Sequence, residues 1–296
     1  MYEHHFKLAL LPFENTPDGR FFFASEQHRE ALAAIEYTIR MRKGFVLVTG
    51  EVGTGKTTVG RVMRDRCSEH VTLVEVTYGH LGREELLRQV LRAIGLQTES
   101  DADHSVLVEQ LRGFLQEQLR VDRPVVLFID EAQTLADEVL EELRLMSNLD
   151  TATAKAIQIV LVGQPELRLR LRDPVHSALR QRIVMARQIE PLNFQETGQY
   201  IYHRIRAASV DAGDPGVTFN VDVINTIYQF SNGIPRLINI ACDSCLLMAY
   251  VREQTEITTS IVHKVMADMM PNLEICSPGV PAETAEPPAL ALAGAG

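Results

Sequence analysis

The chain has 296 residues, 46% of them hydrophobic, and a formal net charge of −10 at pH 7. A chain of this length and hydrophobic content can bury a sizeable core, and we expect one large domain with a smaller one. The acidic balance argues against a protein whose whole surface binds nucleic acid, although a local basic patch stays compatible with it. Pro12 and Asn15 break the N-terminal apolar run, and no run of about 18 apolar residues occurs, so neither a signal peptide nor a membrane span is expected.

The first predicted strand is the apolar run GFVLVTG at 44–50, and the glycine-rich turn GEVGTGKTT follows it at 50–58. The spacing G-x-x-x-x-G-K-T is that of the phosphate-binding P-loop, and the helical pattern KTTVGRVMRDRC supplies the helix that should follow. Backbone N–H groups of such a turn bind phosphate oxygens, and glycines keep side chains out of the way. The alternative is a glycine-rich turn that fits the pattern by chance. The predicted nucleotide-binding residues are Gly50, Glu51, Val52, Gly53, Thr54, Gly55, Lys56, Thr57 and Thr58.

Further strands and helices alternate along the chain. The apolar patterns at 71–77, 156–166 and 183–191 predict strands, and those at 83–95 and 105–119 predict helices, the first of which ends at Gly95. Alternation of this kind predicts an α/β fold with a parallel sheet and helices on both faces.

A second nucleotide motif lies in RPVVLFIDEAQTL at 123–135, where a buried strand runs into Asp130 and Glu131. Ligands bind at the carboxyl ends of strands in open α/β sheets. Asp130 and Thr57 are therefore the predicted Mg²⁺ ligands, with Lys56 on the β- and γ-phosphates. Glu131 is placed to polarise the attacking water as a general base, which favours ATP hydrolysis. Two acidic residues that cap the next helix are the alternative.

From about 193 to 270 the patterns become helical throughout, and the tail from 271 is rich in Pro, Ala and Gly, so it is predicted to be disordered. Cys242 and Cys245 lie in the apolar helical run INIACDSCLLMAY, with no second Cys or His pair close enough to complete a zinc site. We interpret them as core thiols in a reducing compartment.

Residues 6 to about 270 resemble AAA+ ATPases, and more closely those of the ExeA/GspA type that serve general secretion, pilus biogenesis and exosortase systems. The segments that carry the resemblance include LPFENTPDGRFFFASEQHREALAAIEYTI, LFIDEAQTL, VLVGQPEL, IEPLNFQETGQYIYHRI and SNGIPRLINIACD. The resemblance implies an N-terminal linker and first helix at 1–44, a P-loop α/β ATPase core at 45–191, an all-helical lid at 192–270 and a tail at 271–296.

The resemblance also implies roles for single residues. Gln164 stands at the sensor-1 position, where many relatives carry Asn or Thr, and a polar residue at a strand end is the alternative. Arg182 matches the arginine finger that reaches a neighbouring subunit, with Arg180 as its competitor. Arg236 matches sensor 2 of the lid, and both Arg182 and Arg236 could instead be ordinary surface residues. Phe13 is a candidate wall beside adenine, with a place in the core as its alternative.

Two functions fit this sequence. The first is an ATP- and Mg²⁺-dependent protein that assembles or switches a cell-envelope machine for secretion, a type IV pilus or polysaccharide export. It would be a homo-oligomer in the cytoplasm. Secretion-type relatives often continue into a membrane span, and because none is expected in this sequence, we expect the protein to reach the inner membrane through a membrane-protein partner. The alternative is an ATP-dependent DNA-binding regulator of the transposition type. The arginine-rich stretch at 166–182 is interpreted as a subunit interface rather than a nucleic-acid contact.

Overall fold

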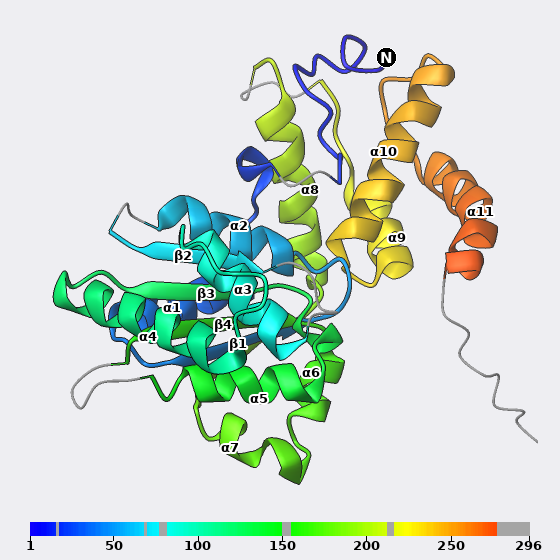
Figure 1. Cartoon of the computed structure of the whole chain (residues 1–296). Coiled ribbons are helices and arrows are strands. Elements are labelled where there is room, and N and C mark those ends of the chain that lie inside the picture. Colours follow the sequence, from blue (N-terminus) through cyan, green and yellow to red (C-terminus); the bar gives the residue numbers. More distant parts are fainter. Residues whose placement is uncertain (16–17, 68–69, 77–81, 150–154, 212–215, 277–296) are drawn as a thin grey trace, which may run out of the picture.

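The computed structural model describes residues 1–15, 18–67, 70–76, 82–149, 155–211 and 216–276 (Figure 1). Its centre is a five-stranded sheet with the strand order β2-β3-β4-β1-β5. Every neighbouring pair of strands is parallel, which confirms the predicted α/β sheet. The strands are β1 (Phe45–Gly50), β2 (Thr72–Val76), β3 (Val125–Ile129), β4 (Ile157–Gly163) and β5 (Ile183–Ile189).

Helices cover both faces of the sheet, so β1, β3 and β4 are buried along their whole length. Successive side chains of a strand point to opposite faces. Phe45 and Leu47 of β1 therefore join the core on one face, and Val46 and Val48 join the core on the other. The edge strand β5 alternates between exposed and half-buried residues until its last residue, Ile189, which is buried. The near-continuous apolar runs in the sequence follow from this double coverage.

The first of these cores is covered by α3 (Arg83–Ala93), α4 (His104–Arg120) and α5 (Asp137–Met146), and the second by α1 (Glu26–Arg40) and α2 (Lys56–Arg66). The side chains of Ser25 and Asp103 accept backbone N–H groups at the starts of α1 and α4. The predicted stop at Gly95 is present, because this glycine takes a left-handed φ of +84° just beyond α3. The shorter elements are α6 (Pro165–Arg170), α7 (Ser177–Arg180) and the 3₁₀ turns Gly19–Phe21, Ala132–Thr134 and Pro174–His176.

The C-terminal part of the chain is helical, as predicted, and lies beside the carboxyl edge of the sheet (Figure 1). An unexpected feature is that the N-terminal segment packs on these helices. Phe6 and Phe13 are part of the same hydrophobic core as Ile205 and Ile238, and Leu8 pairs with Ser209 in an isolated β-bridge. The helices are α8 (Phe194–Ala208), α9 (Val221–Ser231), α10 (Pro235–Val251) and α11 (Thr259–Cys276).

The helix α11 continues to Cys276, past the predicted boundary at 270, and residues 277–296 of the predicted tail lie outside the described residues. Within the described ranges, none of the helices has both the length and the apolar character needed to cross a bilayer. Cys242 and Cys245 of α10 are free and buried, and burial raises the pKa of both thiols. These two residues are core thiols, as the sequence indicates.

Candidate functional site

The turn between β1 and α2 has the backbone geometry of a P-loop. Gly53 and Gly55 take φ values of +84° and +95°, which a residue with a side chain rarely adopts. Neighbouring segments also press on both glycines. A Cβ at Gly53 would lie 2.8 Å from the Arg236 Cβ, and one at Gly55 would lie 2.9 Å from His28 Nε2. Glycine is therefore required at both positions for two independent reasons.

His28 of α1 holds the loop from one side. Its Nε2 lies 3.0 Å from the carbonyl oxygen of Thr54, and its Nδ1 lies 2.6 Å from Ser25 Oγ. A carbonyl oxygen can only accept, so the proton is on Nε2, and in the neutral ring Nδ1 accepts from the Ser25 hydroxyl. Burial lowers the pKa of His28, which favours this neutral form.

Lys56 and Thr57 begin α2 beneath the loop. Lys56 is only 6% exposed, and its Nζ donates to the Glu51 carbonyl at 2.9 Å. Burial lowers the pKa of Lys56, while the nearby carboxylates of Glu131 and Asp130 oppose this shift. A phosphate would take the place of the carbonyl as the partner of this ammonium.

Thr57 and Asp130 meet directly, since Thr57 Oγ1 donates to Asp130 Oδ2 at 3.0 Å. Burial raises the pKa of Asp130, so this carboxylate would gain from a cation close by. A hydroxyl and one carboxylate, facing a space open to phosphates and water, form the donor set that suits Mg²⁺. The residues present therefore fit the predicted metal.

Glu131 follows in a left-handed conformation, with φ of +53°. This geometry is uncommon for a residue with a side chain, and it sets the direction of the Glu131 side chain at the end of β3. Its Oε2 accepts from Gln133 Nε2 at 2.5 Å and, over a long 3.5 Å, from Gln164 Nε2. Gln133 Oε1 in turn accepts the backbone N–H of Gln164 at 3.0 Å. Gln164 thus lies beside Glu131, and Gln133, which the sequence analysis did not single out, connects the two.

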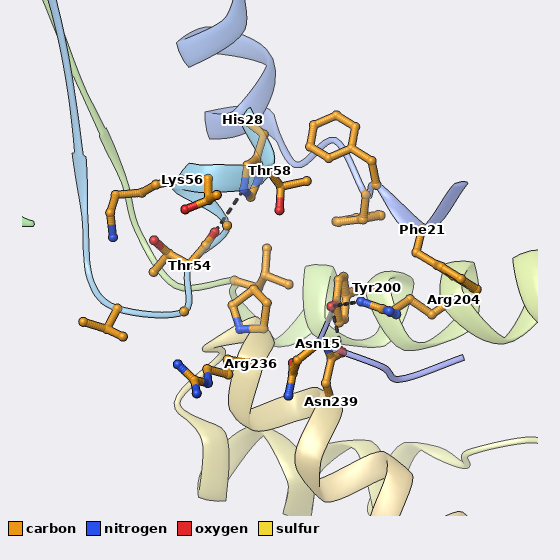
Figure 2. A pocket seen from close by; sticks show the side chains of 18 of the residues that line it. Asn15, Phe21, His28, Thr54, Lys56, Thr58, Tyr200, Arg204, Arg236 and Asn239 are labelled. Carbon is orange, nitrogen blue, oxygen red and sulfur yellow. Dashed lines mark hydrogen bonds between the residues drawn. The ribbon is translucent and has the colours of Figure 1, made fainter. Parts of the chain in front are cut away.

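A cavity of about 480 Å³ runs from the P-loop towards the lid (Figure 2). Arg236 at the start of α10 lines it, and its backbone N–H donates to the Gly53 carbonyl at 3.3 Å. The lid therefore contacts the P-loop directly. Of the predicted site residues, those that line the cavity are Val52, Gly53, Thr54, Gly55, Lys56, Thr57, Thr58, Glu131, Gln164 and Arg236.

Phe13 does not line the cavity, which corrects the prediction that it walls the adenine. It is 2% exposed and packs in the lid core, with its ring 6.1 Å from that of Phe219. The aromatic residues that do line the cavity come from the same N-terminal segment, at 21–23. Phe13 lies away from the cavity because it packs with Tyr2, Phe6 and Leu8 against α8–α11.

Arg182 lies at the opposite edge of the sheet. It directly precedes β5, whose first residue pairs with Phe45 and whose last pairs with Gly50 at the start of the P-loop. Its guanidinium donates to the carbonyl and hydroxyl oxygens of Ser147, at 3.3 and 3.0 Å, and to Asn148 Oδ1. Arg180 donates instead to the carbonyl oxygens of Leu171 and Arg172. Neither arginine lines the cavity of its own chain.

The far end of the cavity holds polar residues that the sequence analysis missed. Arg204 and Tyr200 of α8 and Asn239 of α10 line it together with Asn15. Two spacings could have indicated them, because residues four apart on α8 and three apart from Arg236 on α10 share a helix face. Their contact with Asn15, however, depends on the fold.

Comparisons with known proteins bear on the family of this chain. Residues 39–171 match the family described as an AAA domain. General secretion pathway protein A of Aeromonas hydrophila is 37% identical over 252 residues, which is 85% of this chain and 45% of that protein, so the chain spans less than half of its relative.

Solved structures share the fold at low identity. Cdc6p of Pyrobaculum aerophilum matches with a TM-score of 0.64 and 16% identity, covering 87% of this chain and 70% of that one. The Aeropyrum pernix ORC2 protein matches with a TM-score of 0.63 and 16% identity, covering 89% and 72%. These two matches show the fold alone. The family match and the sequence relative identify the chain as a member of the AAA family of ATPases and a homologue of general secretion pathway protein A.

Proposed function

We propose that this chain binds and hydrolyses MgATP and uses the cycle to assemble or switch a cell-envelope machine for secretion, a type IV pilus or polysaccharide export. The observation that carries the proposal is the meeting of two motifs at one edge of the sheet. The 3.0 Å contact joins Thr57 of the P-loop to Asp130, and Lys56 and Glu131 lie close by in the same cavity.

Each residue then has a defined task. The amides of the P-loop and the Lys56 ammonium bind the β- and γ-phosphates. Thr57 and Asp130 would hold Mg²⁺, which neutralises charge on the phosphates when it is bound. Glu131 accepts a proton from the attacking water through Oε1, since the hydrogen bonds from Gln133 and Gln164 both go to Oε2. Gln133 keeps that carboxylate in position through its hydrogen bond.

The lid and a second subunit complete the site in this proposal. Arg236 contacts the γ-phosphate from the lid, and because the Gly53 carbonyl already bonds this residue, a change at the loop would move the lid. Arg182 is too far from its own P-loop to act there, since β5 separates the two by about 20 Å at roughly 3.3 Å per residue. It therefore acts on the nucleotide of a neighbouring copy, and the chain functions as a homo-oligomer.

The cellular role rests on the relative named for the general secretion pathway. We infer a place at the cytoplasmic side of the inner membrane, reached through a membrane-protein partner. A DNA-binding regulator is the weaker candidate, because its support is a fold shared at 16% identity with structures such as the Aeropyrum pernix ORC1 protein in complex with DNA. Tight, ATP-dependent binding of duplex DNA at physiological salt would reverse this preference, since contacts made only by phosphate neutralisation weaken steeply with salt.

The proposed activity is tested by calorimetric binding of MgATP and by phosphate release, in the wild type, in Lys56→Ala and in the matched control Lys264→Ala. Lys264 is exposed on α11 and does not line the cavity. We expect Lys56→Ala to lose ATP binding and turnover with its circular dichroism unchanged, and the control to keep both. Undiminished ATP binding by Lys56→Ala would refute the role of the P-loop.

A further inference from the structure

Arg204 determines which group donates and which accepts in a series of hydrogen bonds at the lid end of the cavity. Arg204 is only 6% exposed, and its guanidinium can donate hydrogen bonds but never accept them. It donates to the Tyr200 hydroxyl oxygen at 2.8 Å. Because the hydroxyl oxygen accepts from Arg204, its own O–H group donates to another partner, Asn239 Oδ1, at 2.8 Å.

The orientation of two amides follows from this direction. Because Asn239 turns its oxygen towards Tyr200, its Nδ2 faces Asn15 and donates to Asn15 Oδ1 at 3.0 Å. Turning the Asn239 amide would leave the buried Tyr200 proton without an acceptor and would set two amide oxygens against each other. This series of hydrogen bonds therefore fixes which side of the Asn15 amide presents the oxygen acceptor and which side presents the N–H donor.

The backbone of Asn15 is fixed by the same guanidinium. Arg204 also donates to the carbonyl oxygens of Pro12 and Glu14, the latter at 2.9 Å, and it lies 4.9 Å from the centre of the Phe21 ring. Asn15 is exposed and lines the cavity. Within the described part of the chain, Asn15 Nδ2 has no hydrogen-bond partner. Asn15 therefore offers the cavity one N–H donor and the second lone pair of Oδ1, and the orientation of its amide is fixed.

The Asn15 amide, with its donor and acceptor side by side, lies where the base of a nucleotide would be. Lys56 marks the phosphate end of the cavity, and Figure 2 shows Asn15, Tyr200 and Asn239 at the end away from it. An asparagine amide pairs with the Watson–Crick edge of adenine through two hydrogen bonds, because the exocyclic amino group donates to Oδ1 while the ring atom N1 accepts from Nδ2. On this edge guanine carries a carbonyl oxygen in place of the amino group and an N1–H in place of the ring acceptor. With guanine, Asn15 Oδ1 would face the carbonyl oxygen of the base and Asn15 Nδ2 would face its ring N–H.

We propose that Asn15 selects an adenine base over a guanine base, and that Arg204, Tyr200 and Asn239 are positioning residues that set the direction of its amide. The inference rests on the ATP binding proposed above and assigns the residue that distinguishes the adenine base. A loose surface asparagine would not discriminate in this way, because its amide could turn to suit either base.

The test is calorimetric binding of ATP, GTP, inosine triphosphate and tripolyphosphate to the wild type and three variants. The wild type should bind ATP about 10- to 100-fold more tightly than GTP, the discrimination of a good bidentate pair. Asn15→Ala should weaken ATP binding by a similar factor and leave GTP and tripolyphosphate unchanged. Tyr200→Phe keeps the ring but frees the Asn239 amide to turn, so the ATP preference should fall without any change for tripolyphosphate. Asn225→Ala, an exposed asparagine on α9 that does not line the cavity, is the matched control.

Inosine triphosphate separates the proposed contact from simple exclusion of guanine, because inosine has the carbonyl oxygen of guanine but lacks its 2-amino group. It should bind as weakly as GTP. Binding as tight as ATP would overturn the proposal, as would equal affinity of the wild type for ATP and GTP or an unchanged preference in Asn15→Ala. If the wild type binds neither ATP nor tripolyphosphate, the nucleotide site itself is refuted, and the inference falls with it.

Discussion

Arg182→Ala should leave ATP binding nearly intact and abolish most of the turnover. The reason is the distance across the sheet, since β5 extends from Ile183 to Ile189 and places Arg182 about 20 Å from the P-loop of its own chain. No arginine side chain spans that gap, so any contribution must reach a neighbouring copy. Where arginine fingers have been measured in related phosphoryl transfer they are worth about 10³–10⁵ in rate. The variant should therefore turn over at about a thousandth of the wild-type rate or less.

Mixing two inactive variants tests the shared site. Lys56→Ala lacks a working pocket but keeps its finger, and Arg182→Ala has the opposite defect. In a random equal mixture half of the pockets are intact and half of their neighbours carry a finger, so about one junction in four is complete. The mixture should recover up to about a quarter of the wild-type ATPase rate, far above either variant alone, given the size of the finger effect. The rate is measured across mixing ratios, above the concentration at which the protein self-associates.

No recovery at any ratio, with mixed oligomers verified by mass, would refute the shared site. Arg180→Ala is the matched control. The guanidinium of Arg180 donates to the carbonyl oxygens of Leu171 and Arg172, so this substitution should affect local stability more than turnover. A larger loss of turnover in Arg180→Ala than in Arg182→Ala would transfer the finger role to Arg180.

Glu131→Gln should bind MgATP normally and hydrolyse it about 10²–10⁴-fold more slowly, as expected for a lost general base; wild-type phosphate release in this variant would refute that role. Phe13→Ala should lower the free energy of unfolding by about 3–5 kcal/mol in denaturant titrations, because Phe13 is a core residue, while Phe22→Ala, which removes a partly buried ring that lines the cavity, should weaken ATP binding with a smaller loss of stability. The free energy of unfolding should fall as pH drops below about 6.5, since the lowered pKa of buried His28 means that the unfolded chain binds more protons. His28→Gln should reduce this slope, and an identical pH profile in the variant would contradict the assignment.

The fold was largely predictable because the signals were local. The strands are indicated by short, near-continuous apolar runs, and the P-loop by a fixed spacing between a strand and a helix. The chemistry at the carboxyl edge follows from the same logic. Thr57 follows β1 at the start of α2 and Asp130 follows β3, so both residues lie at the carboxyl edge of the parallel sheet, where their contact at 3.0 Å is expected.

The lid end of the site was not predictable in this way. Asn15 and Asn239 are 224 residues apart, and only the packing of the N-terminal segment on α8–α11 brings them together. The same packing explains the error at Phe13. An aromatic residue next to a proline suits a core and a cavity wall equally well, and its neighbours in space decide between the two. Gln133 was missed because its role depends on the conformation of Glu131.

The P-loop is held at consecutive residues from two different parts of the molecule. The lid bonds the carbonyl of Gly53 through the Arg236 N–H, and α1 bonds the carbonyl of Thr54 through His28. The N-terminal segment packs on the lid and precedes α1 in the sequence, so both hydrogen bonds to the loop come from one connected part of the protein. A phosphate that changes the direction of either carbonyl would alter a contact with that part of the protein. The connection between nucleotide and lid therefore needs no long chain of intermediate residues, since it begins at the loop that binds the phosphate.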